Sequence, residues 1–158
     1  MINTDIKGNI KIRKEFEQIV QNSNVLHSYL FLGEDGIGKK EIAKEFAKQI
    51  LCLNKAENCT CKSCICFDTE NHPDFTIINE EGETIKINTI REMISTVYEK
   101  PILSSKKIYI INDCDKMTKE AQNSLLKTLE EPPEYIVIIL ISSNSDMLLN
   151  TIKSRCTK

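Results

Sequence analysis

A glycine-rich stretch at residues 33–40 has the residue types and the spacing that bind phosphate. It reads Gly-Glu-Asp-Gly-Ile-Gly-Lys-Lys and matches the pattern GxxxxGK. Gly33, Gly36 and Gly38 allow backbone N–H groups to turn towards an anion, and Lys39 with the N-terminus of a following helix adds positive potential. We expect a nucleotide phosphate site here. The alternative is a glycine-rich turn that binds nothing.

The next position departs from a working phosphate loop. A Ser or Thr normally follows the lysine, and its hydroxyl oxygen binds Mg²⁺. Lys40 has no such oxygen, and Asp35 adds negative charge inside the loop. The sequence therefore argues against ATP hydrolysis and leaves ATP binding in doubt.

A second part of a nucleotide-hydrolysing site is an apolar strand that ends in acidic residues. The apolar run 108–111 leads into Asn112, Asp113, Cys114 and Asp115. Asn112 stands where the metal-binding aspartate would most simply fall, and Asp113 takes the next position. An asparagine carries no charge for Mg²⁺. The two positions that normally hold the metal, here Lys40 and Asn112, have therefore both lost their usual chemistry. A polar turn after a strand is the alternative role of Asp113 and Asp115.

Five of the seven cysteines fall within residues 52–66. They are Cys52, Cys59, Cys61, Cys64 and Cys66. Cys61 and Cys64 have the spacing that lets two thiolates bind one tetrahedral ion. We predict a structural Zn²⁺ held by Cys52, Cys59, Cys61 and Cys64, with Cys66 as the substitute ligand, in a loop that has little core of its own. Reduced surface thiols, or a redox-active CxxC pair, are the alternatives.

Apolar runs and helical patterns alternate along the chain and would position these residues. Runs typical of buried strands are residues 29–32, 75–78, 108–111 and 136–141. Helical spacing of apolar residues marks residues 15–21, 39–51, 87–98 and 118–131. Because the strands are apolar throughout, helices should cover both faces of a parallel sheet. The predicted fold class is therefore α/β, in the order β-α-β-α-β-α-β after a first helix.

Composition sets broad limits on location and partners. The 158 residues, 41% of them hydrophobic, suit one domain with a buried core. A formal net charge of −2 disfavours a free-standing nucleic-acid binder. No apolar run approaches the roughly 20 residues that span a bilayer, and the N-terminus lacks the core of a signal peptide. We expect a cytoplasmic protein without membrane contact, in which Cys114 and Cys156 are packing residues.

Longer stretches of the sequence are similar to those of a known family. They are residues 27–33 (HSYLFLG), 71–74 (NHPD), 123–133 (NSLLKTLEEPP) and 154–156 (SRC). Together with the phosphate loop and the cysteines, they make the chain resemble the delta-prime subunits of the bacterial DNA polymerase III clamp loader, within the AAA+ superfamily. The resemblance covers nearly the whole chain. It implies a P-loop AAA+ type parallel sheet flanked by helices, with the zinc knuckle as a small insertion.

The resemblance implies roles for two further residues. Arg155 would be an arginine finger that reaches the ATP phosphates of a neighbouring subunit, which suits the bidentate geometry of a guanidinium. An ordinary surface salt bridge is the alternative for this residue. Ser143 would take the place of the nucleotide-sensing polar residue. Delta-prime subunits differ from the motor-type subunits of the loader at the positions of Lys40 and Asn112, as this chain does.

The function implied is that of a clamp-loader subunit of the DNA polymerase III holoenzyme, which helps to load the sliding clamp onto primed DNA. Its partners would be the gamma/tau-type ATPase subunits and the delta subunit, and it would have no ATPase activity of its own. An active ATPase motor subunit of the same loader is the alternative. In the family a helical lid and a helical collar follow this domain. The chain stops two residues after Cys156, and we expect a fragment that lacks both.

Overall fold

Four parallel strands form the sheet at the centre of the molecule. The computed structural model describes residues 10–22, 25–33, 38–53, 60–79 and 83–155. Within these ranges the strands are β1 (Ser28–Leu32), β2 (Phe75–Ile78), β3 (Lys107–Ile111) and β4 (Ile136–Ser142). They lie in the order β1-β4-β3-β2, and each neighbouring pair is parallel. The predicted strands and the parallel sheet are confirmed, with each strand end within one residue of the prediction.

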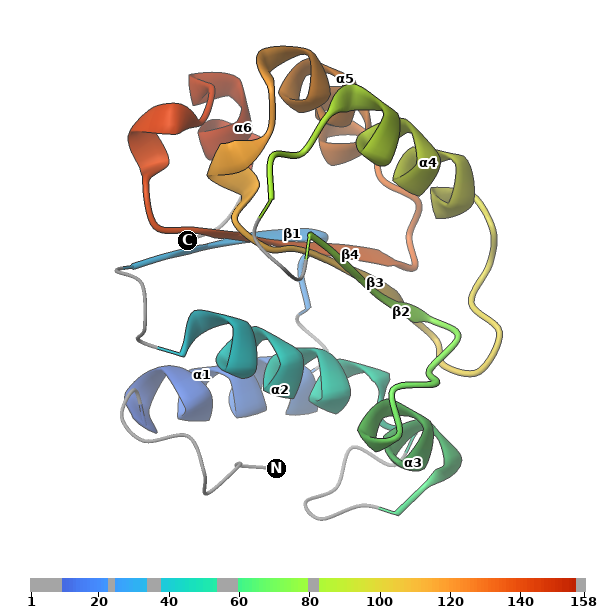
Figure 1. Ribbon diagram of the computed structural model, residues 1–158. Helices are drawn as coiled ribbons and strands as arrows, with labels where there is room; N and C mark the ends of the chain where they lie inside the picture. The colour runs from blue at the N-terminus through green and yellow to red at the C-terminus, as the bar shows by residue number, and fades with distance from the viewer. Residues whose placement is uncertain (1–9, 23–24, 34–37, 54–59, 80–82, 156–158) are drawn as a thin grey trace.

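Helices cover both faces of this sheet (Figure 1). The helices α1 (Ile10–Gln21) and α2 (Lys39–Leu51) lie on one face, and α4 (Ile87–Val97), α5 (Lys119–Glu130) and α6 (Asn150–Arg155) lie on the other. Alternate residues of β4 join the two cores, since Ile139 packs on the α2 side and Leu140 on the α5 side. Strands β3 and β4 are buried along their whole length, which explains why they are almost entirely apolar. Cys114 is buried in the core as predicted, and Cys156 lies outside the described residues.

An additional helix, α3 (Lys62–Asp68), lies in the connection between β1 and β2, beside the end of α2 (Figure 1). The prediction of a loop for this cysteine-rich segment is wrong. Seven residues are too few to show a helical period, and only Ser63 and Cys64 of this helix are buried. A contact from elsewhere in the chain holds the helix, because the Ser63 hydroxyl donates to the Leu51 carbonyl at 2.7 Å. The order after α1 is therefore β-α-α-β-α-β-α-β-α.

The helices α1, α2, α4 and α5 agree well with the sequence patterns, whereas α6 was not predicted. The bounds of α2 are those predicted, and α1 begins five residues before the predicted start. At α5, Thr118 is the N-cap as expected, and its hydroxyl oxygen accepts the N–H of Ala121 at 3.2 Å. Glu131 is the C-cap, and Pro132 and Pro133 end the helix. Within the described ranges, no helix combines the length and the apolar character that crossing a membrane requires.

Candidate functional site

The phosphate-loop residues lie at the carboxyl edge of the sheet, where β1 and β4 end side by side. Gly33 follows β1, and its N–H donates to the carbonyl of Ser142 at the end of β4, at 3.3 Å. Gly38 is the N-cap of α2 with a left-handed φ of 82°, a conformation that favours glycine. The ammonium of Lys39, the first residue of α2, donates to the carbonyls of Gly33 and, at 3.4 Å, of Ser142. Gly36 lies outside the described residues.

Positive charge and a helix N-terminus coincide at this edge. Lys39 and Lys40 are the first two residues of α2, which is 13 residues long. Backbone N–H groups at the start of such a helix attract anions, and the two ammonium groups add to that attraction. Neither lysine offers an oxygen ligand for Mg²⁺.

The side chain of Asn112 bonds to the backbone at the end of the neighbouring strand. Its Nδ2 donates to the carbonyl of Asn79, which follows β2, at 3.3 Å, and Nδ2 of Asn79 donates to the Asn112 carbonyl at 3.2 Å. An aspartate could not make the first bond, because an ionised carboxylate only accepts. Asp113 has a left-handed φ of 50°, and its carboxylate lies 3.7 Å from the ammonium of Lys116. Asn112 and Asp113, which stand where the acidic residues of a hydrolytic site would fall, therefore contact residues near the strand ends.

Ser142 contacts both Lys39 of the phosphate loop and Asp115 after β3, although it was not among the predicted site residues. It is the last residue of β4 and is fully buried. Its carbonyl accepts from Lys39, and its hydroxyl donates to Oδ1 of Asp115 at 3.0 Å. Ser143, the predicted nucleotide-sensing residue, follows the strand and is exposed. One sequence signal could have identified Ser142. It is the polar residue that directly follows the apolar run 136–141, at the same sheet edge as the phosphate loop.

Arg155 is the last residue of α6, on the face of the sheet opposite α1 and α2 (Figure 1). The start of this helix is held by Gln122 of α5. The Oε1 atom of Gln122 accepts the N–H of Leu149 at 2.8 Å, and its Nε2 donates to the Met147 carbonyl at 3.1 Å. Ile152 is fully buried in the core on this face. The helix that ends at Arg155 is therefore anchored to the domain.

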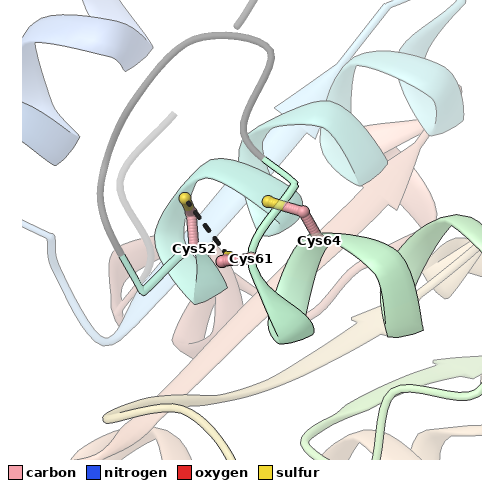
Figure 2. A group of neighbouring side chains, drawn as sticks. All are labelled: Cys52, Cys61 and Cys64. Carbon is pink, nitrogen blue, oxygen red and sulfur yellow. Dashed lines mark hydrogen bonds between the residues drawn. The ribbon is translucent and has the colours of Figure 1, made fainter.

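Three thiols gather where α2 ends and α3 begins (Figure 2). Cys52 is the C-cap of α2, Cys61 is the N-cap of α3, and Cys64 lies in the first turn of α3. Their sulfur atoms lie within 4.8 Å of one another, and Sγ of Cys52 is 3.9 Å from Sγ of Cys61. With Zn–S bonds of about 2.3 Å, the sulfurs of a tetrahedral site lie about 3.8 Å apart. This donor set therefore fits a zinc ion.

Without a cation, the cluster favours the protonated form of the Cys64 thiol. Burial, and then the adjacent thiols of Cys61 and Cys52, raise the pKa of the Cys64 thiol. A bound cation reverses that preference, because the thiolate is the form that binds metal. Of the other predicted ligands, Cys59 lies outside the described residues. The substitute ligand, Cys66, lies on α3 but outside the three-thiol cluster.

Comparison with known proteins places the chain in a family. The sequence model of the family described as "DNA polymerase III, delta subunit" matches residues 8–158. The chain belongs to this family. The delta′ subunit of DNA polymerase III from Bacillus subtilis (strain 168) is 37% identical over 148 residues, which are 92% of this chain and 45% of the relative. The delta′ subunit from Pseudomonas aeruginosa is 36% identical over 137 residues, which are 84% of this chain and 42% of that protein.

Gamma-type subunits are similar as well. The tau/gamma subunit of DNA polymerase III from Haemophilus influenzae is 34% identical over 155 residues, 96% of this chain and 22% of the relative. Among solved structures, a DNA polymerase III gamma subunit-related protein from Thermotoga maritima has a TM-score of 0.67 at 29% identity, over 91% of this chain and 43% of its own. A RuvB mutant from the same organism has a TM-score of 0.54 at 12% identity, over 94% of this chain and 43% of its own, which shows the fold alone.

These findings confirm the resemblance and the fold class. The sheet flanked by helices is of the P-loop AAA+ type, and the cysteine cluster fits a zinc knuckle beside it. The chain spans less than half the length of the curated relatives it matches.

Proposed function

We propose that the chain is the P-loop domain of a clamp-loader subunit of the DNA polymerase III holoenzyme, which helps to load the sliding clamp onto primed DNA. Family membership and the delta′ and tau/gamma relatives support this function. The partners are the gamma/tau-type ATPase subunits and the delta subunit, and the assembly works in the cytoplasm.

The nucleotide site of this subunit is degenerate, and the observation that carries this proposal is the contact between Asn112 and Asn79. The amide of Asn112 donates to the Asn79 carbonyl at 3.3 Å, a bond that a metal-binding carboxylate could not make. Lys40 lacks the hydroxyl that normally completes the metal site. A triphosphate at Lys39 would therefore find positive charge without the two oxygen ligands that hold its Mg²⁺.

The subunit contributes to ATP hydrolysis through Arg155, on a nucleotide that a neighbouring ATPase subunit holds. An arginine supplied in trans stabilises the charge that develops during phosphoryl transfer. Such a group must be presented at a fixed position. The hydrogen bonds of Gln122 and the burial of Ile152, which anchor α6, support this role.

Cys52, Cys61 and Cys64, with Cys59 as the fourth ligand, hold a structural Zn²⁺. When bound, the ion would fasten the start of α3 to the end of α2 and add binding free energy to the stability of the fold. The 3.9 Å separation of the Cys52 and Cys61 sulfurs supports this assignment.

The test is DNA-stimulated ATP turnover by an assembly of the full-length subunit with the gamma/tau-type subunits, the delta subunit and the clamp. Arg155→Ala is expected to slow hydrolysis at the site it serves by about 10³-fold or more. The matched control is Lys153→Ala, which removes a positive charge from the same helix and is expected to leave turnover unchanged. Full turnover with Arg155→Ala would refute the arginine finger.

A second measurement separates the proposed subunit from an active motor subunit. This chain alone is mixed with Mg-ATP, and no steady hydrolysis is expected because both oxygen ligands of the metal are missing. Steady turnover by the chain alone would instead support the motor subunit.

A further inference from the structure

A buried polar cluster joins the cysteine knuckle to the rest of the domain. At its centre is His72, which is 7% exposed and lies between α3 and β2. Its Nδ1 accepts the N–H of Asp74 at 3.0 Å. Because a backbone N–H only donates, Nδ1 is the acceptor and Nε2 carries the hydrogen of the neutral ring. Nε2 lies 2.8 Å from Oγ of Ser63, so His72 donates to Ser63.

The chain of donors continues to one backbone carbonyl. Ser63 accepts from His72 and donates to the carbonyl of Leu51 at 2.7 Å. Ser104 donates to the same carbonyl at 2.7 Å, and its Oγ lies 3.3 Å from Nε2 of His72. The carboxylate of Asp74 accepts the N–H groups of residues 102, 103 and 104 at 2.6, 2.7 and 2.7 Å. The Leu51 carbonyl is thus a junction of the end of α2, the start of α3 and the segment before β3.

This cluster is not a nucleophile with its base, although Ser63 and His72 are the right distance apart. The Nε2 atom already carries its hydrogen and cannot take the proton of the serine. Ser63 is 1% exposed, so no substrate reaches its hydroxyl. The Asp74 carboxylate accepts backbone N–H groups and does not bond to the imidazole. The group of Asp74 that bonds to the imidazole is its backbone N–H. The geometry therefore points to a role in holding structure.

The structure held by this cluster is the set of three thiols. Ser63 lies between Cys61 and Cys64 in the sequence, and the Leu51 carbonyl that it binds directly precedes Cys52. The bond between Ser63 and Leu51 therefore sets the distance between the end of α2 and the CxxC turn of α3. Without it, the Cys52 sulfur would be held near the other two sulfurs by fewer contacts, such as the ion pair between Lys48 of α2 and Asp68 of α3.

We propose that His72 is a positioning residue for the metal site, which orients the Ser63 hydroxyl and so holds the thiols at metal-binding separation before an ion arrives. This inference rests on the metal site proposed above. Buried groups that orient ligands are typically worth 10–100-fold in metal affinity, because a preformed site loses less conformational entropy when the ion binds. The NHPD stretch that contains His72 thereby acquires a physical role.

The two hydrogen bonds of the imidazole can be removed separately. In His72→Asn, the side-chain oxygen occupies about the place of Nδ1 and keeps the bond to the Asp74 N–H. The shorter side chain cannot make the hydrogen bond to the Ser63 hydroxyl. In His72→Gln, the side-chain nitrogen occupies about the place of Nε2 and keeps the Ser63 bond. Affinity for Zn²⁺ is measured by competition with a chromophoric chelator, and Co²⁺ absorption reports thiolate coordination. We expect a 10–100-fold loss for His72→Asn and wild-type affinity for His72→Gln.

Further variants keep the test decisive if His72→Asn fails to fold. Ser63→Ala removes the hydroxyl with a small change in volume, and the same 10–100-fold loss is expected. The control is Ser95→Ala on α4, whose exposed hydroxyl bonds to the Glu92 carbonyl of its own helix. Circular dichroism checks that each variant is folded.

The outcomes separate this inference from the metal site itself. Wild-type affinity in both His72→Asn and Ser63→Ala would overturn the positioning role while leaving the metal site in place. An equal loss in His72→Asn and His72→Gln would also overturn it, since the Ser63 bond would then not be the cause. Wild-type chain without the Co²⁺–thiolate absorption would refute the metal site and the positioning role together.

Discussion

The hydroxyl of Ser142 donates to the carboxylate of Asp115, with 3.0 Å between Oγ and Oδ1. This contact joins the end of β4 to the turn that follows β3. The same Ser142 accepts the N–H of Asn144 on its hydroxyl, at 3.1 Å, and the ammonium of Lys39 on its carbonyl, at 3.4 Å. One buried serine therefore connects the lysine of the phosphate loop with the acidic turn across the sheet edge.

Replacing this serine tests its structural role. In Ser142→Ala, the half-buried Asp115 carboxylate and the Asn144 N–H both lose the buried hydroxyl as a partner. The free energy of unfolding is expected to fall by about 1–3 kcal/mol. Urea denaturation measures it, and Ser143→Ala, at the exposed next residue, is the control with an expected change within about 0.5 kcal/mol. Equal effects of the two variants would contradict the importance of the Ser142 contact.

The Asn112 amide offers a second prediction. In Asn112→Asp, an acceptor replaces the donor that faces the Asn79 carbonyl, and two oxygens then repel each other. We expect a loss of about 1–2 kcal/mol in the free energy of unfolding. The control is Asn123→Asp, the same change at an exposed position of α5, which should be nearly neutral. A variant Asn112→Asp that is as stable as the wild type would show that the Asn79 bond contributes little.

Substitution of single cysteines should separate the metal ligands from the cysteines that bind no metal. Cys61→Ser removes a thiol of the cluster and is expected to abolish stoichiometric zinc and to lower the thermal midpoint of unfolding. Cys66→Ser is the matched control on α3, and it should retain both zinc and stability because Cys66 lies outside the cluster. Metal analysis and calorimetry of the purified variants measure the two quantities. Zinc lost from Cys66→Ser but not from Cys61→Ser would reverse this assignment.

The buried imidazole makes stability depend on pH. Burial lowers the pKa of His72 below its ordinary value of 6.5, an effect that the nearby Asp74 charge opposes. The unfolded chain then binds the proton more readily than the folded chain. The contribution of the neutral His72 to the free energy of unfolding is therefore fully present above pH 6.5 and is lost as the pH falls below that value.

This dependence is measured by urea denaturation between about pH 8 and about pH 5, where histidines titrate, with chelator present to exclude metal release. Wild-type chain should lose more stability on acidification than His72→Gln, which has no group that titrates at this position. The same slope in both proteins would show that His72 takes no proton on unfolding.

Much of the fold could be predicted because the signals are local. The continuous apolarity of residues 136–141 indicates a strand buried on both faces, and the glycines of the phosphate loop mark the turn into α2. The short helix α3 could not be predicted, because its seven residues are held by the contact of Ser63 with Leu51 and not by a period of their own.

The candidate site divides in the same way. By itself the sequence determined the four strands and four of the helices, the glycine-rich loop, the loss of oxygen ligands at Lys40 and Asn112, and the CxxC spacing, because each depends on residue identity or on neighbours within a few positions. Only the tertiary structure decided that Asn112 bonds to Asn79, that Ser142 reaches Asp115 and that Ser63 bonds to Leu51. These partners are brought together by the packing of separate strands and helices, which no local pattern records.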